Sequence, residues 1–240
     1  MITTVHHCTK CGSSHLKKNG KAYNGKQKYY CYDCQAYGVL NPEPRYSEER
    51  KEEIIRAYQE RSSLRGIERI FGVARQTVAK WIKEKVKGLP DLKESLKPAK
   101  PDDVLELDEL WSFVFIKTNK QWVWIALCRR TRQVVAFVIG DRSARTCQRL
   151  WNKIPDEYKS CISFSDFWEA YRKVFPEKSH TCVGKESGET AHVERWNNTL
   201  RQRISRFVRK TLSFSKKEVW HNMVTKLFVY NYNISVAVKY

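Results

Sequence analysis

The sequence predicts a mixed α/β protein in which a small cysteine-rich ribbon and a helical segment precede a larger domain built on a β-sheet. Three observations lead to this fold class. Two Cys-x-x-Cys pairs lie near the N-terminus, apolar residues then recur with the helical period, and from residue 103 onward strand-like runs alternate with helical ones. Prolines punctuate the stretch before residue 103. We therefore expect a ribbon at residues 1–46, helices at 47–89, a linker at 90–102 and an α/β domain at 103–240.

The charge balance indicates a polyanionic partner. The 240-residue chain has 45 Lys and Arg against 26 Asp and Glu, which gives a formal net charge of +19. Such an excess favours nucleic acid first and an anionic membrane surface second. No apolar run approaches the roughly 18 residues that a membrane span needs, and residues 1–10 lack the pattern of a signal peptide. We expect neither a secreted nor a membrane-spanning protein.

The ribbon carries a predicted zinc site. Its two Cys-x-x-Cys pairs, separated by 19 residues, consist of Cys8, Cys11, Cys31 and Cys34. Each pair offers two sulfurs from one tight turn, and four thiolates can close a tetrahedron around Zn²⁺. Because a closed shell leaves no place for a reacting water, we expect the ion to stabilise a segment too short for a large core. Two disulfides are the alternative, and nearby alternative ligands are His6, His7 and His15.

The second segment is predicted to contain a helix-turn-helix. Residues 48–60, 64–70 and 75–85 each place apolar side chains at helical spacing, and Gly72 lies in the turn between the last two. The third helix would then enter the major groove of DNA. The side chains near its start that would contact bases and phosphates are Arg75, Gln76, Thr77 and Lys80. The alternative is an ordinary three-helix bundle with a solvated charged face.

The α/β domain is predicted from alternating apolar runs. Residues 104–111, 121–128 and 134–139 read as three strands, and the short connections between them favour an antiparallel meander. Two further strands are expected at 161–164 and 180–183. The expected helices cover residues 142–152, 169–174 and 190–207, the last with an apolar stripe that ends at Phe207.

Three acidic residues of this domain are predicted to meet. Asp108 lies inside the first strand, Asp166 follows the fourth strand, and Glu194 is on the last helix. Residues 195–240 contain ten basic residues and one acidic residue, so a carboxylate beside so basic a surface indicates a bound cation. At one edge of a mixed sheet, three carboxylates would hold two divalent ions, Mg²⁺ or Mn²⁺, next to a scissile phosphate. Taken singly, each acid is also explained as a solvated or ion-paired side chain.

Four blocks of the chain resemble a known family. Residues 107–113 (LDELWSF), 165–171 (SDFWEAY) and 193–201 (VERWNNTLR) closely resemble the catalytic blocks of the insertion-sequence-one (IS1-type) transposase family, and residues 209–215 (RKTLSFS) are similar to its basic tail motif. The N-terminal ribbon and helix-turn-helix resemble the separate DNA-binding protein of that family. Many members join the two parts by ribosomal frameshifting, whereas here one continuous reading frame contains both.

This resemblance implies an RNase H-like catalytic domain whose DDE triad falls on Asp108, Asp166 and Glu194. It implies cleavage at the ends of a mobile element, joining of the freed 3′-hydroxyls to target DNA, and recognition of terminal inverted repeats by the N-terminal region. Candidate DNA contacts on the last helix are Arg195, Asn198 and Arg201. The partner would be double-stranded DNA, bound by at least a dimer of the chain in the cytoplasm or nucleoid of a prokaryote, without a membrane.

Several alternatives stay open. Glu186 and Glu189 compete with Glu194 as the third acid, although the Glu-Arg-x-Asn-x-x-Leu-Arg context favours Glu194. Glu109 competes with Asp108, and we expect only one of the two at the site because neighbouring strand residues point to opposite faces. A non-catalytic DNA-binding regulator with a retired RNase H-like domain is the main functional alternative, and a nuclease that hydrolyses without joining is another.

Overall fold

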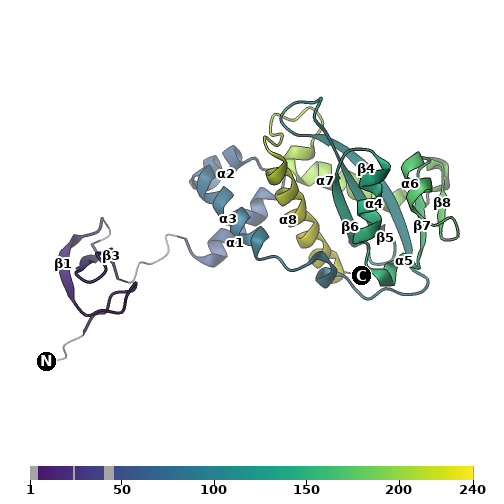
Figure 1. Ribbon diagram of the computed structural model, residues 1–240. Coiled ribbons are helices and arrows are strands. Elements are labelled where there is room, and N and C mark those ends of the chain that lie inside the picture. The colour runs from purple at the N-terminus through teal and green to yellow at the C-terminus, as the bar shows by residue number, and fades with distance from the viewer. Residues whose placement is uncertain (1–4, 24, 41–45, 240) are drawn as a thin grey trace. The chain divides into compact units, whose positions relative to one another are not determined.

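The computed structural model describes residues 5–23, 25–40 and 46–239. Contacts divide the chain into two compact units, residues 1–50 and 51–240, and the division falls in the first turn of helix α1 (Glu48–Tyr58). Figure 1 shows the elements of both units along the chain. Within the described ranges, no helix is both long enough and apolar enough to cross a membrane.

The first unit is a small antiparallel sheet. Its strands β1 (Leu16–Lys21), β2 (Gln27–Cys31) and β3 (Tyr37–Val39) lie in that order. Among the residues of this unit that the structure describes, Cys8 and Cys31 are the only apolar side chains that are buried. The sheet therefore has almost no hydrophobic core, which is the condition in which small domains depend on a metal or disulfides for stability.

Helices α1, α2 (Leu64–Phe71) and α3 (Arg75–Lys87) form where the helical period predicts them. Gly72 ends α2 with a φ of 66°, in the left-handed region that favours glycine, and its N–H donates to the backbone carbonyl of Glu68. The turn between α2 and α3 is thus built by the residue expected there. α3 also packs against α8 (Glu218–Ala237), and α2, α3 and most of α1 belong to the same compact unit as the larger sheet.

A five-stranded mixed sheet forms the centre of the second unit (Figure 1). Strands β4 (Val104–Phe113), β5 (Lys120–Cys128) and β6 (Val134–Gly140) make the predicted antiparallel meander. Strand β7 (Ile162–Ser165) is parallel to β4, and β8 (His180–Cys182) is parallel to β7. The strand order is β6-β5-β4-β7-β8, which confirms the prediction of a mixed α/β domain.

Helices cover both faces of this sheet, and β4 alternates between them. Its Leu105 and Leu107 belong to the hydrophobic core formed with α4 and α6, whereas Glu106 and Asp108 make hydrogen bonds to α7. The helices and helical turns of this part are α4 (Ala144–Lys153), α5 (Asp156–Lys159), α6 (Glu169–Val174), η2 (Lys185–Ser187), α7 (Ala191–Arg203), η3 (Ser205–Phe207) and α8.

The C-terminal helices differ from the prediction. The sequence predicts one helix over 190–207, whereas α7 ends at Arg203 because Ile204 adopts an extended backbone conformation before the short turn η3. The sequence pattern does not predict α8. The buried positions of α8 include the polar residues His221, Thr225 and Asn233, which interrupt the apolar stripe from which a helix is recognised.

Residues 90–102, for which the sequence predicts a linker, belong to the second unit and bond to its α/β part. They contain the helical turn η1 (Leu92–Ser95). The backbone N–H of Lys97 donates to the side chain of Gln133 at 2.9 Å, and its carbonyl accepts from the hydroxyl of Tyr158 at 2.7 Å. These bonds connect the proline-punctuated stretch directly to the α/β part.

Candidate functional site

The candidate site lies at an open edge of β4. Strand β7 pairs with β4 only from Val104 to Glu106, so the rest of β4 extends beyond its parallel neighbour. Asp108 is two residues past the last pair, and Asp166 directly follows the end of β7. Both carboxylates therefore reach the same corner of the sheet, Asp108 from inside β4 and Asp166 from the end of β7, where open α/β sheets place ligand sites.

A cavity of about 420 Å³ occupies this corner. Asp108, Asp166 and Glu194 all line it, although 27 residues separate the last two in the sequence. One carboxylate oxygen each of Asp108, Asp166 and Glu109 lies within 4.8 Å of the others. These carboxylates are hard oxygen donors of the kind that Mg²⁺ and Mn²⁺ prefer. The three side chains are therefore able to hold a divalent ion.

The surroundings of Asp108 are those of a half-buried acid in a cluster of like charges. Burial raises the pKa of Asp108, and the negative charges of Asp166 and Glu194 raise it further. Two hydrogen bonds oppose this shift: the backbone N–H of Glu109 donates to Oδ1 at 2.8 Å and the amide of Asn197 donates to Oδ2 at 2.6 Å. A bound cation would relieve the same repulsion.

Glu109 is also at the site, contrary to the expectation that only one of the two neighbours would be. Its side chain does leave the opposite face of β4, where it accepts a hydrogen bond from the hydroxyl of Tyr171 at 2.8 Å and pairs with Arg142. The edge of β4 is open here, so the longer glutamate side chain still reaches the cavity. Burial, followed by the charge of Asp166, raises the pKa of Glu109 to about 7.

Arg142 holds Glu109 from between two indole rings. Its guanidinium group lies 3.9 Å from the ring centre of Trp168 and 4.6 Å from that of Trp122. This stacking fixes the arginine, and the arginine in turn fixes Glu109 through its Nε, 2.7 Å from Oε1. The carboxylate of Glu109 is therefore bonded to two side chains, Arg142 and Tyr171, whereas that of Asp108 is bonded to one, Asn197.

The two alternatives to Glu194 as the third acid, Glu186 and Glu189, lie outside the cavity. Glu194 is in the first turn of α7, lines the cavity and accepts a hydrogen bond from the Thr190 hydroxyl at 3.2 Å. The carboxylate of Glu189 pairs instead with Arg129 at 2.7 Å, and that of Glu186 folds back over Gly184. Neither rival lines the cavity that contains Asp108 and Asp166.

The helix that carries Glu194 is attached to β4 by a buried glutamate, Glu106. Its Oε2 accepts hydrogen bonds from the backbone N–H groups of His192 at 2.8 Å and Val193 at 3.0 Å. Its Oε1 pairs with Arg129 at 2.8 Å and with the ring Nδ1 of His192 at 2.6 Å. A carboxylate from β4 thus binds the free N–H groups at the start of α7, where the helix dipole also favours negative charge. The sequence pattern gives Glu106 no predicted role.

Glu106→Ala should destabilise the second unit by about 3–5 kcal/mol, because Arg129 would lose a buried partner and two backbone donors would be left without an acceptor. Urea unfolding of the variant and the wild type measures this difference. Glu169→Ala is the matched control, since its ion pair with Lys173 is largely exposed. A loss below about 1 kcal/mol for Glu106→Ala would show that the carboxylate does not hold α7.

The predicted DNA-contacting residues of α7 divide into two groups. Asn198 and Arg201 line the carboxylate cavity, whereas Arg195 is exposed outside it. Arg201 is held by backbone carbonyls, at 3.1 Å from that of Phe207 and 3.3 Å from that of Trp111. Asn197, which binds Asp108, was missed by sequence reasoning; its place in the same block as Glu194 was the available signal.

On α3, the predicted recognition residues are accessible to different degrees. Gln76 and Lys80 are exposed, and Thr77 is half-buried. Arg75 is also half-buried and forms an ion pair with Glu68 at 2.8 Å, so its charge already has a partner within the protein. Lys80 makes an exposed contact with Glu84, at 3.7 Å. The face of α3 opposite its buried apolar stripe is therefore open to a partner.

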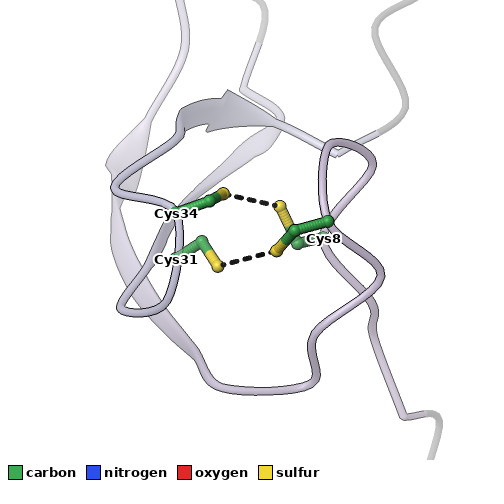
Figure 2. Close-up of side chains that lie close together, drawn as sticks. Cys8, Cys31 and Cys34 are labelled. Atoms are coloured by element: carbon green, nitrogen blue, oxygen red, sulfur yellow. Dashed lines mark hydrogen bonds between the residues drawn. The ribbon is translucent and has the colours of Figure 1, made fainter.

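The four cysteines of the ribbon meet as predicted. The four Sγ atoms all lie within 4.8 Å of one another; they belong to Cys8, Cys11, Cys31 and Cys34. Figure 2 shows the labelled side chains of Cys8, Cys31 and Cys34 pointing toward one another. The Cys8–Cys34 and Cys11–Cys31 sulfur distances are 3.5 and 3.6 Å, and none of the four is in a disulfide. A zinc tetrahedron with bonds of about 2.3 Å requires sulfurs about 3.8 Å apart, so the cluster fits the ion.

The second unit is similar in sequence to known proteins. Residues 104–234 match the family described as IS1 transposase. The insertion element iso-IS1n protein InsB of Shigella dysenteriae is 36% identical over 126 residues, which cover 52% of this chain and 93% of that protein. The insertion element IS1 protein InsB of Shigella flexneri is 35% identical over 119 residues, covering 50% and 88%. The IS1 4 protein InsB of Escherichia coli K12 is 35% identical over 50% of this chain and 69% of its own length.

Proposed function

Because this chain belongs to the IS1 transposase family, we propose that it cuts and joins DNA strands at an active site made of Asp108, Asp166 and Glu194. The observation that carries the proposal is that these three acids, from β4, the end of β7 and the start of α7, line one cavity. Carboxylate oxygens of Asp108 and Asp166 lie within 4.8 Å of each other, and the charges of Asp166 and Glu194 both act on Asp108, so these acids repel one another unless a cation lies between them. A purely structural role does not explain why three carboxylates line one cavity of a strongly basic protein.

The donors of this cavity fit divalent metal ions. Asp108, Asp166 and Glu194 would hold them, and Mg²⁺ or Mn²⁺ would then activate the attacking oxygen and stabilise the leaving one during in-line displacement at phosphorus. The other residues position these acids: Asn197 orients Asp108, Thr190 orients Glu194, and Glu106 fixes α7 to β4. Glu109 is held by Arg142 and Tyr171, which favours Asp108 as the ligand from β4.

Cationic side chains at the same cavity would hold the DNA backbone. Lys185, Arg201 and Arg209 line it together with the acids. They are placed to bind the phosphates that flank the one being cut, while the metal ions offset the charge of the carboxylates. The strand order β6-β5-β4-β7-β8, with a meander followed by two parallel strands, supports an RNase H-like domain as the scaffold.

The N-terminal part of the chain would recognise the DNA ends. We assign the zinc ribbon, residues 1–46, and the helix-turn-helix, residues 47–89, to binding the terminal inverted repeats of an insertion element. Residues 103–240 would then catalyse the chemistry, with residues 90–102 connecting the two parts. Binding two element ends in one reaction requires at least two copies of the chain, and its place of action would be the nucleoid of a prokaryote.

The direct test is a strand-transfer assay with the purified chain, Mg²⁺ or Mn²⁺, and DNA that carries both ends of the insertion element encoding it. The proposal predicts 3′-hydroxyl cleavage products at the element ends and joined products with target DNA. Cleavage without joined products would identify a nuclease that only hydrolyses. Specific binding without any cleavage would instead favour the non-catalytic DNA-binding regulator.

DNA affinity should fall steeply with salt. For six to ten phosphate contacts, a rise from about 50 to 200 mM salt weakens binding by roughly 10³–10⁵-fold through counterion release. Fluorescence anisotropy at several salt concentrations measures the slope, and Lys80→Ala should reduce it by about one. Lys173→Ala, an exposed lysine on α6 paired with Glu169, should leave the slope unchanged. A salt-independent affinity would contradict the role given to the basic surface.

A further inference from the structure

A second cavity adjoins the one that contains the acids. It has a volume of about 250 Å³, and its apolar lining includes Trp111, Phe113 and Phe207. The rings of Trp111 and Phe113 are 5.7 Å apart on the same face of β4, at the edge that β7 leaves open. Trp111, Arg201 and Arg209 line both cavities, so the aromatic cavity lies directly beside the carboxylates.

The charged groups around this aromatic cavity are all cationic. They are Lys117, Arg201, Arg206, Arg209 and Lys210. Arg201 and Arg206 are held by the backbone carbonyls of Phe207 and Phe214. Within the described part of the chain, Lys117, Arg209 and Lys210 have no ion-pair partner. Three cations thus remain available to a ligand at the mouth of an apolar cavity.

We propose that this aromatic cavity binds one unstacked base of the DNA next to the strand held at the acids. The inference rests on the proposed function and extends it. Aromatic rings combined with a cationic groove are the chemistry by which proteins hold single-stranded nucleic acid, with bases stacked on rings and phosphates on lysine and arginine. Bases inside an intact duplex are stacked on both sides and have no free face for Trp111 or Phe113. The occupant is therefore a base that has left the stack.

The experiment measures how protein variants bind DNA from which one base has been removed. The probe is a fluorescein-labelled DNA fork with one single-stranded arm, of arbitrary sequence, in which each position near the junction is made abasic in turn. Anisotropy without added divalent metal gives the affinity. Trp111→Ala should weaken binding of the intact fork about fivefold or more, since stacking of one base contributes at least that factor. At one abasic position the wild type should lose the same factor, and Trp111→Ala should lose nothing further.

Controls separate stacking from folding. Trp111→Phe keeps a ring and should retain most of the affinity, whereas Phe113→Leu keeps apolar volume without a ring and should show the same coupling if Trp111→Ala fails to fold. Phe137→Ala removes a half-buried aromatic residue of β6, at the other edge of the sheet, and should leave binding unchanged. Thermal unfolding verifies that each variant is folded.

Three results would overturn the inference. If folded ring-removing variants bind the fork as tightly as the wild type, or lose affinity equally at every abasic position, no base occupies the cavity. That outcome leaves the proposed transposase function intact. If the wild type binds neither the fork nor duplex DNA, then the proposed function fails as well as the base-binding cavity.

Discussion

Asp108→Asn, Asp166→Asn and Glu194→Gln should each abolish DNA cleavage and strand transfer while DNA binding persists. Each change removes a negative donor from the cavity without changing side-chain size. Metal ions supply several kcal/mol of transition-state stabilisation, so loss of a ligand should lower the rate by about 10³-fold or more. Gel analysis of cleaved and joined products measures the rate, and anisotropy on the same DNA verifies that binding is retained.

The rival acids provide matched controls for Glu194. Glu186→Gln and Glu189→Gln make the same chemical change within the eight residues that precede it, but neither side chain lines the cavity. Both variants should keep cleavage within a few-fold of the wild type. If Glu194→Gln stays active while one of these two is inactive, the third acid has been assigned to the wrong residue. If all three triad variants cut DNA normally, the cavity is not the active site.

Cys31→Ser should unfold the ribbon and remove specific end binding. The described residues of this unit bury no apolar side chains other than Cys8 and Cys31, so the free energy of folding has to come from the metal. Structural Zn²⁺ sites contribute on the order of 10–16 kcal/mol of binding free energy, far more than so small a core supplies. Mass spectrometry of the native protein should find one zinc ion per chain, and the variant should contain none.

The melting of the second unit should be unaffected by Cys31→Ser, because the two units are separate in their contacts. Cys182→Ser is the matched control: this half-buried cysteine lies in β8, outside the cluster, and its loss should leave the zinc content unchanged. A wild-type protein that binds no zinc, or a Cys31→Ser variant that keeps full affinity for the element ends, would contradict the account of the ribbon.

Much of this fold was predictable because its strands are rich in apolar residues and because an acid within a strand is unusual. The second and third strands of the meander are largely apolar runs between polar turns, and the first strand alternates apolar and polar residues; an aspartate inside such a strand, as Asp108 is, requires a specific explanation. The four ribbon cysteines were predictable from spacing alone, because two short knuckles can bring their sulfurs together whatever the intervening chain does.

The supporting contacts were not predictable, since they join residues far apart in sequence. Glu106 reads as one polar residue in an alternating strand, and its partners on α7 are more than 80 residues away. The bond from Asn197 to Asp108 spans 89 residues. Local patterns specify which residue types face a helix or a core, but not which distant backbone N–H or amide will meet a buried carboxylate.

Glu109 shows a limit of the alternation rule. The rule correctly places it on the opposite face of β4 from Asp108, yet it gives no information on where the neighbouring strand stops. Because β7 pairs only as far as Glu106, side chains from both faces approach the open edge. Edge geometry depends on the length of a strand that comes more than 50 residues later in the chain.

Binding of Mn²⁺ measured by electron paramagnetic resonance tests the central claim most directly. The zinc-loaded protein is titrated with Mn²⁺ in the presence of DNA. The account predicts two bound ions per active site in the wild type, and loss of binding in Asp108→Asn, Asp166→Asn and Glu194→Gln but not in Glu186→Gln. Equal Mn²⁺ binding by the wild type and all three triad variants would contradict it.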